Sequence, residues 1–164
     1  MNLEFKNIKK VTIDKTISLD CGAELKGFDI AYETYGTLNE NKSNAILVFH
    51  ALSGDQFATE TNTITGKDGW WGYAIGEDRA VDTNKYFVIC ANVLGGCMGS
   101  TGPKEIEPST GKAYGLNFPV VTIKDMVSAQ IHLLDYLGIK KTLAVIGGSM
   151  GGMQALQFCT LFPK

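Results

Sequence analysis

The chain has 164 residues, of which 45% are hydrophobic and 20% are charged, and its formal net charge is −2. This size and composition are typical of a single globular domain spanning residues 1–164, with a sizeable core. The charge balance and the lack of long Lys/Arg runs disfavour a nucleic-acid or anionic-membrane partner. No apolar run approaches the roughly eighteen residues of a membrane span, and the polar N-terminus does not resemble a signal peptide, so we expect a cytoplasmic protein.

The four cysteines lack the spacings that are typical of metal sites. Cys90 and Cys159 lie in apolar segments and are expected to be buried, whereas Cys97 lies in a glycine-rich loop. We therefore expect reduced thiols and no bound metal.

Several segments have the patterns of β-strands. Residues 16–19 and 28–34 alternate apolar and polar positions on either side of Cys21-Gly22, which predicts an antiparallel pair. Three mostly apolar runs predict parallel strands buried on both faces: Ala45–Phe49, residues 86–91 and residues 142–146.

Two helices are predicted between and after these strands. Apolar side chains recur at helical spacing over residues 123–137, with a Thr122/Asp125 capping signal before them and Gly138 after them. A second helix follows Ser149 and ends before Pro163. Strands that alternate with helices predict an α/β fold with a mostly parallel sheet and flanking crossover helices. Two long excursions, residues 54–81 and 95–118, interrupt this pattern where such sheets keep their sites.

The most informative motif is the Gly-x-Ser-x-Gly pattern formed by Gly147, Ser149 and Gly151. A predicted strand precedes it and a predicted helix follows it, as in a nucleophile elbow, where a serine sits on a very tight turn. The alternative is an ordinary glycine-rich turn with an incidental serine. We interpret Ser149 as a candidate nucleophile, with the helix N-terminus favouring negative charge at the reacting carbonyl.

A second segment, His50-Ala51-Leu52, directly follows the apolar strand Ala45–Phe49. In elbow-serine proteins this loop gives one backbone N–H of the oxyanion hole, and the residue after the nucleophile gives the other. Leu52 and Met150 are therefore the candidate donors, acting through their backbone amides. The alternative is an ordinary loop without a catalytic role.

The chain contains two histidines, and both precede Ser149. The elbow architecture takes its catalytic histidine from a loop after the serine. We therefore expect His50 to brace its loop, although a role as the base stays open. His132 shares the polar face of its helix with Asp125 and Ser128, so we expect it to be exposed to solvent.

Residues 92–103 form a glycine-rich block that does not have the spacing of a phosphate-binding loop. No nucleotide site of a standard kind is predicted. The block more plausibly shapes a pocket wall near Ser149, where glycines permit a substrate to approach closely.

Several motifs together resemble homoserine O-acetyltransferases, which are acyltransferases of the α/β-hydrolase fold. The resemblance runs from Tyr32 to the end of the chain and rests on these blocks: residues 32–39 (YETYGTLN), 50–52 (HAL), 69–71 (GWW), 82–83 (DT), 92–103 and 147–156.

The resemblance implies a function in methionine biosynthesis. Ser149 would take an acetyl group from acetyl-CoA, a substrate and not a permanently bound cofactor, and pass it to the hydroxyl of L-homoserine. Family members are considerably longer. Their triad aspartate and histidine, a substrate-binding arginine and the lid that forms most of the homodimer contact follow the elbow. The chain thus resembles an N-terminal portion of the fold, without the lid and C-terminal strands. We expect it to be inactive alone, with an open apolar edge at residues 142–146.

Three alternatives remain open from the sequence. The acyl group could be succinyl or the acceptor could be serine. An esterase of the same fold would use water as the acceptor, because acyl-enzyme chemistry is shared by both. The chain could also be an inert truncated product.

Overall fold

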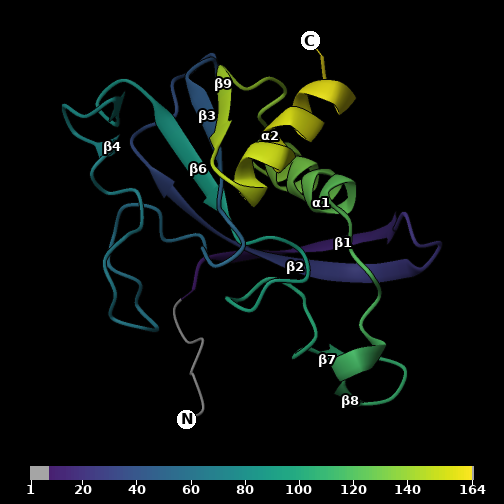
Figure 1. Cartoon of the computed structure of the whole chain (residues 1–164). Coiled ribbons are helices and arrows are strands. Elements are labelled where there is room, and N and C mark those ends of the chain that lie inside the picture. Colours follow the sequence, from purple (N-terminus) through teal and green to yellow (C-terminus); the bar gives the residue numbers. More distant parts are fainter. Residues whose placement is uncertain (1–7, 164) are drawn as a thin grey trace.

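The computed structural model describes residues 8–163 and shows a mixed five-stranded sheet in the order β1-β2-β6-β3-β9 (Figure 1). Its strands are β1 (Lys10–Ser18), β2 (Glu24–Tyr35), β3 (Ala45–Phe49), β6 (Phe87–Ala91) and β9 (Ala144–Gly147). Strands β6, β3 and β9 run parallel to one another, while β2 is antiparallel to both β1 and β6. The predicted α/β sheet is confirmed.

The N-terminal hairpin is longer than the alternation of apolar residues predicted. Strand β2 pairs with β1 over its first part, and its end, Tyr32 to Tyr35, pairs with β6. The pairing of β1 with β2 shifts register between Ile13 and Thr16. The buried side chains of β1, Val11, Ile13 and Ile17, keep period-two spacing, but the exposed Lys15 interrupts them, so the alternation of apolar residues predicted only the second part of the strand.

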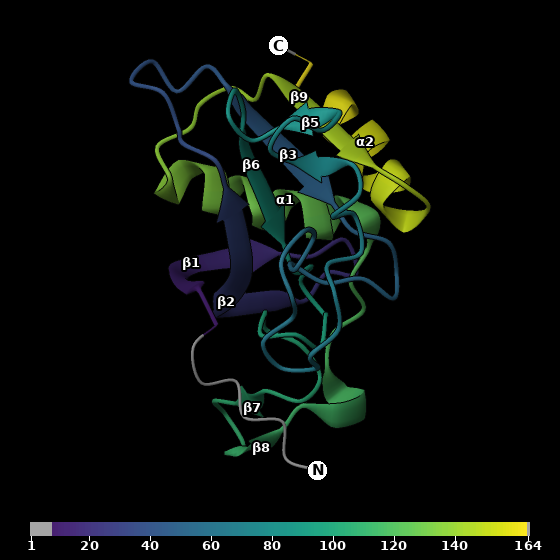
Figure 2. The ribbon, with the colours of Figure 1, turned by 90° about the vertical axis from the view of Figure 1, so that its left-hand side faces the viewer.

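Two helices, α1 (Ile123–Tyr136) and α2 (Met150–Leu161), cover one face of the sheet (Figures 1 and 2). The capping prediction for α1 is confirmed, because Thr122 and Asp125 form a reciprocal capping box. The prediction of an exposed His132 is wrong. Its ring is half-buried and packs edge-on against Phe28, 5.8 Å between centroids, because the β1–β2 hairpin lies against this side of α1.

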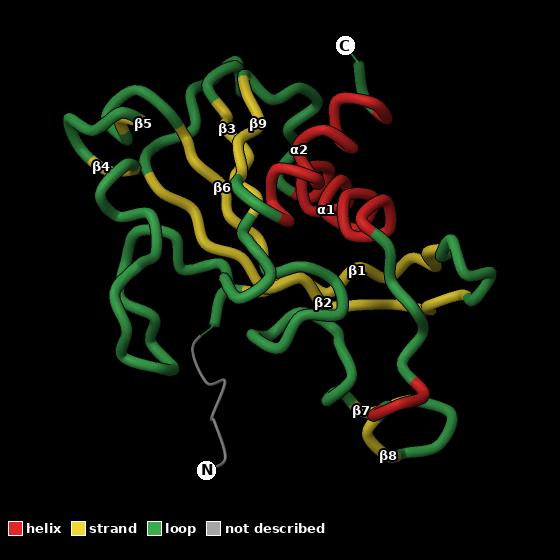
Figure 3. Tube along the Cα trace, viewed as in Figure 1, coloured by secondary structure: helices red, strands yellow, loops and turns green. Residues whose placement is uncertain are grey.

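The opposite face of the sheet is covered by the excursion between β3 and β6 (Figure 3). It contains only two short strands, β4 (Ile75–Gly76) and β5 (Val81–Asp82). Trp70 and Trp71 pack from this excursion against a core cluster. The second excursion carries β7 (Ile106–Glu107), β8 (Lys112–Ala113) and the 3-10 turn η1 (Gly115–Asn117), which lie away from the sheet (Figure 1).

Strand β9 forms one edge of the sheet, since within residues 8–163 it pairs with β3 alone. A groove of about 610 Å³ runs beside it, lined mostly by apolar side chains of α1, α2 and the segment before β9. Cys159 lies in this groove and is exposed, so the expectation of its burial is wrong: nothing in the described chain covers that side of α2. Cys90 is buried as predicted. No helix in the described part of the chain is long and apolar enough to cross a membrane.

Candidate active site

Ser149 lies at the junction of β9 and α2 and has a backbone conformation that is unusual for a residue with a side chain. Its φ is 56° and its ψ is −127°, and it is the N-cap residue of α2. Such strain is typical of functional turns, and a nucleophile elbow has this strand–turn–helix arrangement. The residue is exposed, and its side chain makes no capping hydrogen bond to α2. The hydroxyl is therefore free to meet a substrate.

Two of the four glycines around Ser149 are required by close backbone contacts. A Cβ on Gly147 would overlap the backbone of Gly151, and a Cβ on Gly151 would overlap the carbonyl of Phe49. By contrast, a Cβ on Gly148 would meet nothing within 4 Å. Helix α2 thus begins directly against the end of β3, and this contact fixes the turn that presents Ser149.

Leu52 and Met150, the two predicted oxyanion donors, line one pocket of about 340 Å³. The other walls come from His50, Gly54, residues 92–97 and neighbouring apolar side chains such as Met126. Leu52 is 80% exposed. The structure brings the two predicted donor residues to the same cavity. Ser149 immediately precedes Met150 but is not among the lining residues.

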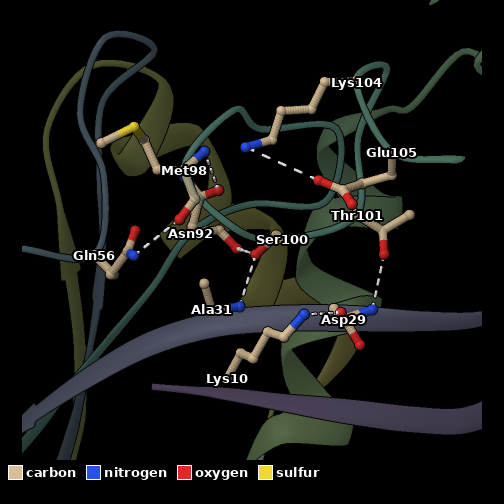
Figure 4. Close-up of polar contacts among 10 residues, drawn as sticks. All are labelled: Lys10, Asp29, Ala31, Gln56, Asn92, Met98, Ser100, Thr101, Lys104 and Glu105. Atoms are coloured by element: carbon tan, nitrogen blue, oxygen red, sulfur yellow. Dashed lines mark hydrogen bonds and ion pairs between the residues drawn. The ribbon is translucent and has the colours of Figure 1, made fainter. Parts of the chain in front are cut away.

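The glycine-rich block after β6 forms a wall of this pocket and is held by buried polar contacts (Figure 4). The side-chain oxygen of Asn92 accepts a hydrogen bond from the Met98 amide, 3.2 Å. The backbone carbonyl of Asn92 accepts one from the Ser100 hydroxyl, 2.6 Å. Gln56 donates to the Met98 carbonyl, 2.9 Å. The Ala31 amide of β2 donates to Ser100, 3.0 Å. The loop is therefore anchored to the sheet and to the first excursion.

His50 is almost completely buried, with 1% of its surface exposed. Its Nδ1 lies 2.7 Å from the Ala51 carbonyl, and its Nε2 accepts a hydrogen bond from the Val93 amide, 3.2 Å. Burial lowers the pKa of His50, which outweighs the opposite effects of the Ala51 carbonyl and the Asp55 carboxylate. The ring thus joins the loop after β3 to the loop after β6. This is the bracing that the sequence predicted.

Three buried amide side chains near the site were not recognised in the sequence. Asn92 connects the two loops, since its Nδ2 lies 3.4 Å from the Nε2 of His50. Gln130 of α1 donates to Gln154 of α2, 3.1 Å, and Gln154 donates to the His50 carbonyl, 3.4 Å. Gln154 shares the buried face of α2 with Gly151 and Phe158. A polar residue inside an otherwise apolar pattern was the only available signal.

Within residues 8–163 no group of three or more His, Cys, Asp or Glu side chains is arranged to hold a metal ion. The family profile described as "alpha/beta hydrolase fold" matches residues 44–164. The chain belongs to the alpha/beta hydrolase fold family.

Relatives of this chain include homoserine O-acetyltransferases. The chain is 63% identical over 157 residues to a homoserine O-acetyltransferase of Pelagibacter ubique. This alignment covers 96% of the chain and 42% of the relative. The resemblance inferred from the sequence motifs is confirmed. The chain spans about two fifths of the length of that relative.

Solved structures with the same arrangement include both a transferase and an esterase. A crystal structure of homoserine O-acetyltransferase from Bacillus anthracis matches with a TM-score of 0.86 and 38% identity, covering 95% of this chain and 44% of that one. Esterase E22 matches with a TM-score of 0.85 and 40% identity, covering 95% and 45%. The fold of this chain is thus shared by one solved structure named as a transferase and one named as an esterase.

Proposed function

We propose that this chain supplies the nucleophile and oxyanion hole of a homoserine O-acetyltransferase that uses acetyl-CoA as its acyl donor. The observation that carries the proposal is the strained Ser149 between β9 and α2, in a chain that is 63% identical to an enzyme of that name. Methionine biosynthesis and a cytoplasmic location are parts of the same proposal. L-Homoserine and acetyl-CoA are its small-molecule substrates.

The proposed reaction has two steps. The Ser149 hydroxyl attacks the thioester carbonyl, the C–S bond breaks, and CoA leaves as a thiol with the proton that the serine lost. The hydroxyl of homoserine then attacks the carbonyl carbon of the acetyl-serine ester, the bond between this carbon and the Ser149 oxygen breaks, and the proton of the homoserine hydroxyl returns to the Ser149 oxygen. In each step the backbone amides of Leu52 and Met150 would stabilise the oxyanion.

Proton transfer requires a base that the described residues do not place beside Ser149. Both nitrogens of His50 are engaged within its own loops, and His132 packs on Phe28. We propose that the base, and the acid that orients it, come from polypeptide that the longer relatives carry and these 164 residues do not. These residues alone would then be inactive, because an unassisted serine is a weak nucleophile.

The second candidate function is hydrolysis of acetyl esters, and the likeness to esterase E22 favours it. The two functions differ in the acceptor, which is an alcohol for the transferase and water for the hydrolase, and the hydrolase takes an acetyl ester in place of acetyl-CoA as its donor. The test is to supply acetyl-CoA to the protein that contains this chain, with and without homoserine, and to follow free CoA and O-acetylhomoserine. CoA release that requires homoserine and yields the ester supports the transferase.

CoA release at the same rate without homoserine would instead identify a hydrolase. Succinyl-CoA and serine serve as the alternative donor and acceptor in the same assay. A protein that releases no CoA under any of these conditions and also hydrolyses no acetyl ester would contradict both functions and would favour an inert product.

A further inference from the structure

The carbonyl of Ala51 is held by two donors at the start of the loop that contains Leu52. The Nδ1 of His50 lies 2.7 Å from this oxygen, and the amide of Gly54 donates to it at 2.8 Å. A carbonyl oxygen can only accept hydrogen bonds, so Nδ1 must carry a proton. A Cβ on Gly54 would lie 3.0 Å from the His50 Cβ, which shows how tightly the loop folds over the ring.

The other side of the ring fixes the same tautomer independently. Nε2 accepts from the Val93 amide at 3.2 Å, which requires a lone pair on this nitrogen. The side-chain oxygen of Asn92 accepts from Met98, so its NH₂ group is the end that faces Nε2, at 3.4 Å. Both sides therefore require a neutral imidazole with its proton on Nδ1.

The contact with Ala51 also determines where the next amide points. The Ala51 carbonyl and the Leu52 N–H belong to one peptide unit, and among residues 8–163 all peptide bonds are trans. In a trans peptide the C=O and N–H vectors are antiparallel. Holding the carbonyl toward His50 therefore turns the Leu52 N–H away from the ring. Leu52 also lines the same pocket as Met150, the other candidate donor.

We infer that His50 is a positioning residue, whose Nδ1–H holds the Ala51–Leu52 peptide so that the Leu52 N–H can donate to the oxyanion. This inference rests on the proposed function for its catalytic meaning, whereas the geometry of the peptide can be tested separately. Asn92 and Val93 support this role of His50, because both donate toward Nε2 and so keep the ring proton on Nδ1.

Two substitutions separate the two ends of the ring. In His50→Asn the side-chain amide reaches the position of Nδ1 and can still donate to Ala51, but the acceptor for Val93 is lost. In His50→Gln the longer amide reaches the position of Nε2, and the donor to Ala51 is lost. In the protein that contains this chain, we expect His50→Gln to lower kcat by about 10²–10³-fold, as for loss of an oxyanion donor.

For the matched variant His50→Asn we expect kcat within about tenfold of the wild type, and KM unchanged in both variants, because the peptide acts on the transition state. If His50 were the general base, Asn could not replace it, and both variants would lose activity equally. That result would overturn the inference, as would a His50→Gln enzyme with wild-type kcat.

A second measurement does not depend on activity. Nitrogen-15 NMR of the histidine rings reports which nitrogen of His50 carries the proton, and hydrogen exchange reports how well the amides of Leu52 and Gly54 are held. We expect the Nδ1–H tautomer in the wild type, and faster Gly54 exchange in His50→Gln than in His50→Asn. A proton on Nε2 would overturn the inference even if the protein proves to be a hydrolase or inactive, and an unchanged tautomer with no catalysis would overturn only the proposed function.

Discussion

The pocket beside Met150 and the groove along β9 lie on the same sheet but are lined by side chains of different chemical character. The pocket, about 340 Å³, is enclosed by loops whose buried polar groups are bonded to one another through His50, Asn92 and Ser100. The groove, about 610 Å³, is lined mostly by aliphatic and aromatic side chains, and Leu143 at its rim is exposed.

The two regions are therefore expected to respond differently to substitution. A hydrogen-bonded network fixes its members by directional contacts, so the walls of the pocket hold their shape through contacts within this chain. An apolar groove on an edge strand exposes both hydrophobic surface and unpaired backbone groups, and both favour association. Substitutions at the pocket should therefore change the rate, and substitutions at the groove should change association.

The largest expected effect is at the nucleophile. Ser149→Ala in the protein that contains this chain should abolish acetyl-enzyme formation and lower kcat by about 10⁶-fold, because the loss of a triad nucleophile removes most of the rate. Mass spectrometry of the acylated protein and the CoA-release assay measure it. A variant that retains more than about one per cent of the activity would contradict the role of Ser149.

A smaller effect is expected at the oxyanion donors. Replacing the peptide N–H of Met150 by an ester oxygen should lower kcat by about 10²–10³-fold. Leu52→Met is the control, because it keeps the backbone donor, and such apolar exchanges usually cost less than about 1.5 kcal/mol. Unchanged turnover in the backbone ester would exclude Met150 as a donor.

The close contact between α2 and β3 should make the free energy of unfolding sensitive to substitution at Gly151. Gly151→Ala would push a Cβ into the carbonyl of Phe49, so we expect the free energy of unfolding to fall by about 3 kcal/mol, the upper end of what overpacking usually costs. The matched variant Gly148→Ala meets nothing within 4 Å and should be tolerated. Urea unfolding measures both variants. Equal losses would show that the space between Gly151 and Phe49 can accommodate a Cβ, against this prediction.

A pH effect follows from the buried ring of the pocket. Because burial lowers the pKa of His50, the folded state binds fewer protons than the unfolded state, whose histidine pKa is about 6.5. The contribution of His50 to stability is therefore fully present above about pH 6.5 and is lost progressively as the pH falls below it.

The same measurement on a variant isolates this contribution. His132 has a lowered pKa for the same reason and changes stability in the same direction, so the variant must leave it in place. Urea unfolding at about pH 5 and about pH 7.5 should show a smaller loss on acidification in His50→Asn than in the wild type. Equal losses would mean that His50 titrates normally.

The smallest effect on unfolding is expected at the groove. Leu143→Lys places a charge at the rim of the open edge, which should reduce dye binding and self-association of this chain while changing the free energy of unfolding by less than about 0.5 kcal/mol. Leu116→Lys is the control, because Leu116 is also exposed but lies in η1, away from the groove. If both variants reduced association equally, general charge and not the edge would be responsible.

The sequence predicted those features that depend on neighbours along the chain. The strand Ala45–Phe49 was predicted with its observed bounds, and the Thr122/Asp125 capping box and the turn at Ser149 were predicted as found. Apolar periodicity, capping chemistry and glycine spacing are local properties, so one sequence contains them.

Features that depend on distant segments could not be predicted. His132 was expected to be exposed because its helical face is polar, but the hairpin that covers it lies about a hundred residues earlier. The contact between His50 and Asn92 joins residues 42 positions apart, and neither residue type indicates from the sequence which residue it will contact. In the site, the positions of Leu52 and Met150 were predictable from the motif, whereas the buried network that holds the loop was not.

The position of β3 in the sheet imposes an order on the emerging chain. This wholly apolar strand lies between β6 and β9, and both of its neighbours are synthesised after it. Residues 45–49 must therefore wait without a strand partner until residues 87–91 and then 144–147 have left the ribosome. Long-range parallel pairing of this kind is slow, and an unpaired apolar strand is prone to aggregate while it waits. Ser149, two residues after β9, is thus set in place only when the last strand of this sheet has docked.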